Sequence, residues 1–171
     1  REFFDLVLEL PGDAPKLFAL PRQPVSDAEF AIGLYASTLV KDGGTLQIGI
    51  GSLSDALCHA LVLRHVRNAE YLRMLDALEP SLRGSALVRE RGGTEPFAIG
   101  LYGASEMVND GFMHLRRAGI LVRKVLDDEA LMARVDAGSA SDADSARLEA
   151  DGHWLNGGFY LGSTDLYEWL R

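Results

Sequence analysis

Residues 43–57 constrain the fold more than any other stretch, because a strand pattern passes through glycines directly into a helix pattern. Residues 45–48 have the β-branched and apolar side chains of a buried strand, and residues 52–57 have the pattern of a helix start. Gly49 and Gly51 allow close backbone approach, and the first turn of a helix offers N–H groups without partners. The junction indicates an α/β fold whose loop suits a phosphate, a carboxylate or a developing oxyanion, although glycines can also serve only to shape a tight turn.

Strand and helix patterns alternate along the rest of the chain. We expect further strands at residues 3–10, 97–102, 120–125, 147–155 and 157–162. We expect helices at residues 26–40, 64–78, 107–118, 127–135 and 163–171, with connections at 79–94 and 137–144. The alternation predicts a single α/β domain over residues 1–171, with an open parallel or mixed sheet flanked by helices.

Two helix starts have the Ser-x-x-acid spacing of a capping box, Ser26 with Glu29 and Ser52 with Asp55. These spacings predict where the first two helices begin. On the first helix we expect a buried apolar stripe that consists of Ile32, Ala36, Leu39 and Val40.

The 17 basic and 25 acidic residues give a formal net charge of -8, which argues against a broad nucleic-acid surface. The single cysteine, Cys58, excludes an internal disulfide and a multi-cysteine metal cluster, and the four histidines lack metal-ligand spacing, so we expect no metal. The chain has no apolar stretch of membrane-spanning length and no signal-peptide pattern, so we expect no membrane partner and a cytoplasmic location. Both ends lie inside element patterns, which suggests a piece of a longer protein.

Glu106 is the candidate catalytic residue, because it follows three small residues next to a predicted helix start. Small side chains let a substrate approach, and the preceding strand is expected to end at the sheet edge where α/β folds bind ligands. The alternative is that this carboxylate only complements the helix dipole. Asp110, one helical turn later, is placed either to orient Glu106 or to lie on the helix surface.

Three other chemistries fit the residues less well. Cys58 and His59 have no partner at catalytic spacing, so we interpret them as a small buried thiol and a packed or surface imidazole. A dinucleotide fingerprint needs a third glycine where Ser54 stands, although Glu70 lies near the expected position of the ribose-binding acid. The sequence contains no Gly-Lys-Ser/Thr, which excludes a P-loop.

Three segments match a known family in order. They are residues 42–56 (Asp-Gly-Gly-Thr-Leu-Gln-Ile-Gly-Ile-Gly-Ser-Leu-Ser-Asp-Ala), 103–111 (Gly-Ala-Ser-Glu-Met-Val-Asn-Asp-Gly) and 157–168 (Gly-Gly-Phe-Tyr-Leu-Gly-Ser-Thr-Asp-Leu-Tyr-Glu). With them, the chain resembles the acetyl-CoA hydrolase/transferase family, which includes acetate, butyrate and 4-hydroxybutyrate CoA-transferases. The resemblance extends from about Pro24 to the end of the chain.

This resemblance implies a CoA-transferase (NagB/RpiA-like) fold, with the chain as most of the C-terminal catalytic half of a two-domain protein, and it allows a homodimer. The family's catalytic glutamate corresponds to Glu106. It attacks an acyl-CoA thioester, and CoA then passes through a glutamyl-CoA thioester to a small carboxylate, or water hydrolyses the intermediate. The family's CoA-binding loop corresponds to Gln47, Gly49, Ile50, Gly51, Ser52 and Leu53.

One departure and two rival functions stay open. Several family members have a histidine where this chain has Ala104, so the resemblance does not specify the acyl group of the substrate. The rivals are a non-catalytic acyl-CoA-binding or assembly module with the same fold, and a nucleotide-binding domain that uses the same loop. The densest basic cluster near the motif, which either meets CoA phosphates or forms solvated surface, consists of Arg116, Arg117, Arg123 and Lys124.

Overall fold

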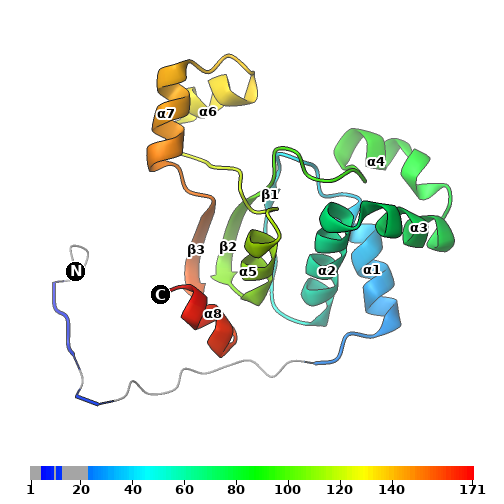
Figure 1. The fold of residues 1–171 in the computed structure, drawn as a ribbon, viewed down its shortest axis with the longest axis horizontal. Helices are drawn as coiled ribbons and strands as arrows, with labels where there is room; N and C mark the ends of the chain where they lie inside the picture. The colour runs from blue at the N-terminus through cyan, green and yellow to red at the C-terminus, as the bar shows by residue number, and fades with distance from the viewer. Residues whose placement is uncertain (1–4, 10, 13–22) are drawn as a thin grey trace.

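The computed structural model describes residues 5–9, 11–12 and 23–171, and a parallel sheet lies at its centre (Figure 1). Within these residues the sheet has three strands, which are, in spatial order, β1 (Thr45–Leu46), β2 (Tyr102–Val108) and β3 (Leu155–Tyr160). The predicted α/β fold, an open parallel sheet flanked by helices, is confirmed.

Helices lie before, between and after the strands in sequence. In chain order they are α1 (Asp27–Ser37), α2 (Ser52–Val66), α3 (Asn68–Leu78), α4 (Ala86–Arg91), α5 (Asp110–Arg117), α6 (Glu129–Asp136), α7 (Asp142–Asp151) and α8 (Thr164–Trp169), with a 3₁₀ turn, Leu82–Gly84, before α4. In Figure 1, α6 and α7 form a pair that stands away from the sheet. None of the helices in the described part of the chain has the length and apolar character needed to cross a membrane.

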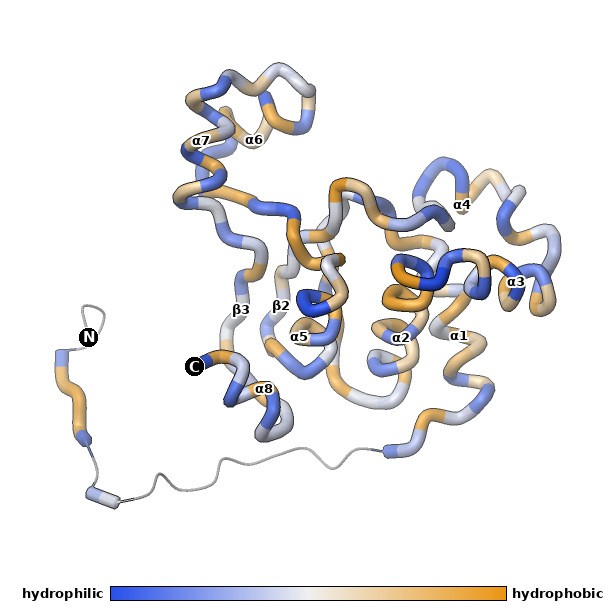
Figure 2. The backbone as a smooth tube through the Cα atoms, in the orientation of Figure 1, coloured by the Kyte–Doolittle hydropathy of each residue, from blue (hydrophilic) through white to orange (hydrophobic). Residues whose placement is uncertain are grey.

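The strand predicted at residues 3–10 is wrong for the part that the structure describes. Residues 5–9 form no strand, and the side chains of Leu6 and Leu8 are 85% and 80% exposed. Figure 2 shows this segment as a hydrophobic stretch apart from the helices and strands. Residues 3, 4 and 10 lie outside the described residues. A strand needs partners for its backbone groups, and an apolar pattern alone does not supply them.

The start of α1 agrees with the sequence, but its buried face does not. The capping box is confirmed, because the Glu29 N–H donates to Ser26 Oγ at 3.3 Å and the Ser26 N–H donates to Glu29 Oε2 at 2.8 Å. The predicted stripe is wrong for Ile32 and Leu39, which are 51% and 47% exposed, whereas Val40 packs against the core. Gly33 faces α2 instead, and a Cβ there would lie 2.7 Å from the Ala56 carbonyl carbon. A close backbone contact therefore decides which side of α1 is buried.

The correction with the largest consequence concerns Glu106. The strand predicted at residues 97–102 lies at residues 102–108, and the following helix begins at Asp110, not at residue 107. A Cβ on Gly103 would lie 2.5 Å from Leu155 Cδ1 and 3.1 Å from Phe112 Cε1. Gly103, the first of the small residues that suggested a helix start, is therefore required by close packing in the middle of the sheet.

Four further segments differ from the sequence prediction. The strand predicted at residues 120–125 is reduced to one antiparallel bridge, between Val125 and His153. Residues 147–155 belong mostly to α7, and the connections at 79–94 and 137–144 contain α4 and the start of α7. The strand predicted at 157–162 is present as β3, but it is mostly exposed. These misses share one cause, because periodicity does not report which strands find partners.

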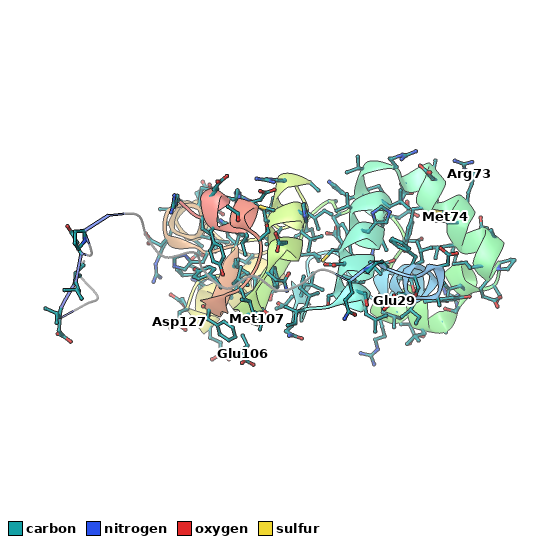
Figure 3. The ribbon with its side chains drawn as sticks, turned by 90° about the horizontal axis from the view of Figure 1, so that it is seen from below. Glu29, Arg73, Met74, Glu106, Met107 and Asp127 are labelled. Carbon is teal, nitrogen blue, oxygen red and sulfur yellow. The ribbon has the colours of Figure 1, made fainter. Side chains whose placement is uncertain are left out.

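The helices that follow β1 and β2 are expected on one face of the sheet. Right-handed crossovers between parallel strands taken in sequence order place their helices on the same side. A core of buried side chains joins β1, β2, α2 and α5, and it includes Leu46, Ile48, Leu61, Val108, Phe112 and Leu115. Glu106 projects in the opposite direction, away from α5 and α8 (Figure 3). Among the described residues, the face of β2 that carries Glu106 is open.

Asp42 joins the segments that lead into β1 and β2. Its carboxylate accepts hydrogen bonds from the N–H groups of Gly43, Ala98, Ile99 and Gly100, at 2.9 to 3.1 Å. Burial alone would raise the pKa of Asp42, but these hydrogen bonds hold it below its ordinary value of 3.8. The carboxylate therefore stabilises the fold most when it is ionised.

We expect Asp42→Asn to lower the free energy of unfolding by about 2 kcal/mol at neutral pH, because the amide cannot accept all of these hydrogen bonds. A pKa that is lower in the folded state gives a stabilisation that is complete above pH 3.8 and is lost as the pH falls through the folded-state pKa. Urea unfolding should therefore show a difference between wild type and variant that shrinks in acid. A difference that is unchanged at low pH would contradict this role.

Candidate functional site

Glu106 lies on β2, two residues before the strand ends at Val108, and its side chain is exposed. Parallel strands bring their carboxyl ends to one edge of a sheet, which is where α/β folds bind ligands. The register pairs Thr45 with Tyr102 and Leu46 with Gly103, one residue before Gln47 and Ala104. Leu46 and Gly103 face the core, so alternation of side chains places Gln47 and Ala104 on the opposite face, toward which Glu106 also projects (Figure 3). The structure thus brings the predicted glutamate and the start of the predicted loop together.

The glycine loop, residues 47–51, is bonded to β2 and to the residue that follows it. Ser105 Oγ lies 3.2 Å from the Ile48 carbonyl oxygen, and Asn109 Nδ2 donates to the Gly49 carbonyl oxygen at 2.6 Å. These two contacts are on either side of Glu106 in sequence. The loop therefore cannot move far from the glutamate without breaking them.

The backbone of this loop offers hydrogen-bond donors. In the described part of the chain, the N–H groups of Gly49, Ile50 and Gly51 have no hydrogen-bond acceptor. Gly51 is the N-cap of α2, has φ +117°, and brings no capping side chain to the first helical turn. Unpaired N–H groups at a helix start favour a negatively charged ligand.

The helix start predicted at Ser52 is confirmed, but Ser52 and Asp55 form no capping box. The Ser52 hydroxyl donates to Glu29 at the start of α1, so it does not cap its own helix. This hydrogen bond is the largest cause of the lowered pKa of Glu29, followed by the hydrogen bonds from Ser26. The Ser52 side chain therefore connects the loop to α1, and Ser52 contributes only its backbone to the first turn of α2.

Most of the predicted site is open to solvent. Gln47, Gly49 and Gly51 are exposed, and Ile50 and Leu53 are 45% and 51% exposed. A carboxylate in water is a modest nucleophile, so chemistry at this site needs a cover that excludes water.

The interpretation of Cys58 as a buried thiol is confirmed. Its side chain is 5% exposed, and burial, together with the charge of Asp55, raises its pKa to about 12. A thiol with that pKa holds its proton at neutral pH and is not a nucleophile. His59 is exposed and packs edge-on against Phe30, with ring centroids 5.5 Å apart, as predicted for a packed or surface imidazole.

Asp110 does not lie one helical turn beyond Glu106, because Glu106 is in a strand. Asp110 is the first residue of α5, and its carboxylate accepts hydrogen bonds from the N–H and hydroxyl of Ser163, which caps α8. It therefore joins the start of α5 to the start of α8, at the same edge of the sheet as the glycine loop.

Three members of the predicted basic cluster are engaged with neighbouring groups. The guanidinium of Arg116 stacks over Trp154 at 4.6 Å. Arg123 forms an ion pair with Asp136 at 3.1 Å, and Lys124 forms one with Glu149 at 2.8 Å. These contacts favour a role in packing and surface ion pairs over contact with CoA phosphates.

A separate apolar pocket of about 460 Å³ lies between α1, α2 and α3. None of the residues predicted to bind CoA lines it. No group of three or more histidine, cysteine, aspartate or glutamate side chains in the described residues could hold a metal ion.

Sequence reasoning missed Asn109 and Ser105, which hold the loop. The signal for Asn109 was available, because asparagine directly before Asp-Gly is a preferred helix N-cap, and a helix start placed at residue 110 would have identified it. Ser105 had no such signal, since its role depends on the pairing of β1 with β2.

Comparison with known proteins gives partial matches. No family model matches the chain. It is 30% identical to the 4-hydroxybutyrate coenzyme A transferase of Clostridium kluyveri over 108 residues, which is 63% of the chain and 17% of that protein. It is 29% identical to the succinyl-CoA:cyclohexane-1-carboxylate CoA transferase of Geobacter metallireducens over 100 residues, which is 55% of the chain and 23% of that protein. The chain thus spans less than a quarter of each relative in the matched region, and over that region it is similar to CoA-transferases.

Proposed function

We propose that the chain is the catalytic part of an acyl-CoA-processing enzyme, a CoA-transferase or acetyl-CoA hydrolase, with Glu106 as nucleophile. The partial similarity to two CoA-transferases supports the class. The observation that carries the proposal is the position of Glu106 on an open sheet face, beside a loop whose N–H groups have no acceptor in the described residues. A nucleophile and oxyanion donors are the two parts that acyl transfer requires.

In the proposed reaction, the Glu106 carboxylate attacks the thioester carbonyl and the C–S bond breaks. CoA departs as the thiolate, and an acyl-glutamyl anhydride is formed. The thiolate then attacks the glutamyl carbonyl, the acyl group departs as a carboxylate, and a glutamyl-CoA thioester remains. An acceptor carboxylate reverses these two steps and leaves as the new acyl-CoA. Water in place of the acceptor releases CoA and free Glu106, which is hydrolysis.

The loop has two proposed roles. The N–H groups of Gly49, Ile50 and Gly51 stabilise the oxyanion of each tetrahedral intermediate, and the first turn of α2, with Ser52 and Leu53, receives an anionic part of CoA. Gln47 is on the same face as Glu106 and adds a side-chain donor.

We also propose that this domain has a CoA-transferase (NagB/RpiA-like) fold and works in a longer two-domain protein whose other domain covers the Glu106 face. Parallel sheets are almost always covered on both faces, whereas this one is open on one side among the described residues. The exposed apolar side chains of Ile50 and Leu53 beside the loop fit such a cover. The cover would also exclude water from the thioester.

Trapping the intermediate tests the proposal. We expect the protein at its natural length, incubated with acetyl-CoA and then borohydride, to gain a reduced side chain in the peptide that contains Glu106, detected by mass spectrometry. Hydroxylamine should give a hydroxamate at the same residue. Thioester cleavage with a label on any other residue would overturn the assignment of Glu106.

The same preparation separates the rival functions. Calorimetry that detects CoA binding, without cleavage of any acyl donor tried, would favour a non-catalytic acyl-CoA-binding module. Preference for NAD over CoA would favour a nucleotide-binding domain.

A further inference from the structure

We infer that Asn109 is a positioning residue, which orients the glycine loop so that its N–H groups face the reacting thioester. The inference rests on the proposed function of Glu106 and the loop, and it deepens that function by naming what holds the loop in place. Asn109 lies directly after β2, is 8% exposed, and is the N-cap of α5.

The two hydrogen bonds of the Asn109 side chain allow only one amide orientation. Its Oδ1 accepts from the Gly111 N–H at 2.9 Å, and its Nδ2 donates to the Gly49 carbonyl oxygen at 2.6 Å. A backbone N–H only donates and a carbonyl only accepts, so the flipped amide would face both partners wrongly. The helix cap therefore determines which atom Asn109 presents to the loop.

Close packing of Gly111 brings Asn109 within reach of the loop. A Cβ on Gly111 would lie 2.6 Å from Cys58 Sγ and 2.9 Å from Ile48 Cδ1. The absence of a side chain lets the start of α5 approach α2 and the end of β1. The distance from Asn109 to Gly49 is thus set by the buried core and not by the exposed loop.

The hold on the Gly49 carbonyl also determines where the next N–H points. A trans peptide is planar, and its C=O and N–H point in opposite directions. No described peptide bond is cis. With the Gly49 oxygen turned toward buried Asn109, the Ile50 N–H points to the other side, where Gly49 and Ile50 are exposed. A thioester oxygen that approaches from solvent would meet this N–H.

Ser105 acts in the same way on the preceding peptide, but more weakly. Its hydroxyl lies 3.2 Å from the Ile48 oxygen and 2.8 Å from the Met107 oxygen, and a single hydrogen cannot serve both fully. Asn109 has a separate hydrogen for Gly49 at 2.6 Å. The orientation of the loop therefore depends mainly on Asn109.

Two variants test this role. Asn109→Asp keeps the helix cap and loses the donor. Asn109→Ser also keeps a cap and adds no charge, but its side chain is too short to reach Gly49. With acetyl-CoA as the donor, we expect both to lower kcat by about 10- to 100-fold, with a smaller change in KM, because an oxyanion donor acts in the transition state. Asp128→Asn, at the N-cap of α6, is the matched control and should keep wild-type kcat.

Amide NMR of wild type and variants gives a second readout that needs no turnover. We expect the Gly49 and Ile50 signals to shift or broaden in both variants, while those of Gly43 and Gly100 stay in place. An effect of Asn109→Asp alone would indicate added charge and overturn the inference. Wild-type kcat and unchanged loop signals in both variants would also overturn the inference, but they would leave Glu106 as the proposed nucleophile. If the wild-type protein cleaves no thioester, the proposed function fails, and the NMR comparison alone then decides the role of Asn109.

Discussion

Glu106→Gln is expected to lower acyl-CoA turnover by about a thousandfold or more. The glutamine has nearly the same shape, but its amide oxygen is a far weaker nucleophile than a carboxylate, so the anhydride would not form. Because Glu106 is exposed, we expect the free energy of unfolding to change by less than about 0.5 kcal/mol. Release of CoA thiol from acetyl-CoA by the protein at its natural length measures the rate.

Glu90→Gln provides the control for this substitution. Glu90 is an exposed glutamate on α4, so this substitution makes the same chemical change outside the proposed site. Its turnover should match wild type. Retention of more than about a tenth of wild-type kcat by Glu106→Gln would remove Glu106 from the role of nucleophile.

Arg64→Met is expected to lower the free energy of unfolding by about 3 kcal/mol, with no direct effect on the proposed chemistry. The Arg64 side chain is 1% exposed, and burial lowers its pKa. Its guanidinium donates to the carbonyl oxygens of Ser37, Val40 and Glu95, at 3.1, 2.6 and 2.7 Å. Methionine has a similar length but removes all three hydrogen bonds, and each lost hydrogen bond from a charged donor costs about 1 kcal/mol or more.

The position of Arg64 explains why its loss affects the whole domain. It joins the end of α1 to α2 and to the segment before β2, and its guanidinium stacks on Phe97 at 4.3 Å. Arg67→Met is the matched control, since Arg67 is largely exposed and pairs only with Glu70 in the contacts that the structure describes. Urea unfolding should show a change of less than about 0.5 kcal/mol for this control. A cost below about 1 kcal/mol for Arg64→Met would contradict its bridging role.

Local signals predicted the parts of the fold that depend on near neighbours in sequence. The capping box of Ser26 and Glu29, the helix after the glycine loop and the burial of Cys58 were all predicted correctly. These features need only helix geometry and the apolar pattern around them. A parallel or mixed sheet was also predicted from the alternation of strand and helix, and the sheet is parallel.

The position of β2 was predicted wrongly because it depends on partners far away in sequence. Residues 97–102 have the apolar pattern of a strand, yet the hydrogen-bonded strand is residues 102–108, where Gly103 fits against Leu155 and Phe112. A segment becomes a strand where neighbouring backbones accept its hydrogen bonds and its side chains fit. Neither condition can be read from six residues alone.

By itself, the sequence determined that a strand, a glycine loop and a helix follow one another at residues 43–57, and that a single glutamate lies among small residues at position 106. Tertiary structure decided that Glu106 belongs to a strand, that it shares the open sheet face with the glycine loop, and that Asn109 holds the loop from the buried side. The physical reason is that strand pairing and close glycine packing join segments about 60 residues apart, as the hydrogen bond from Asn109 to Gly49 does.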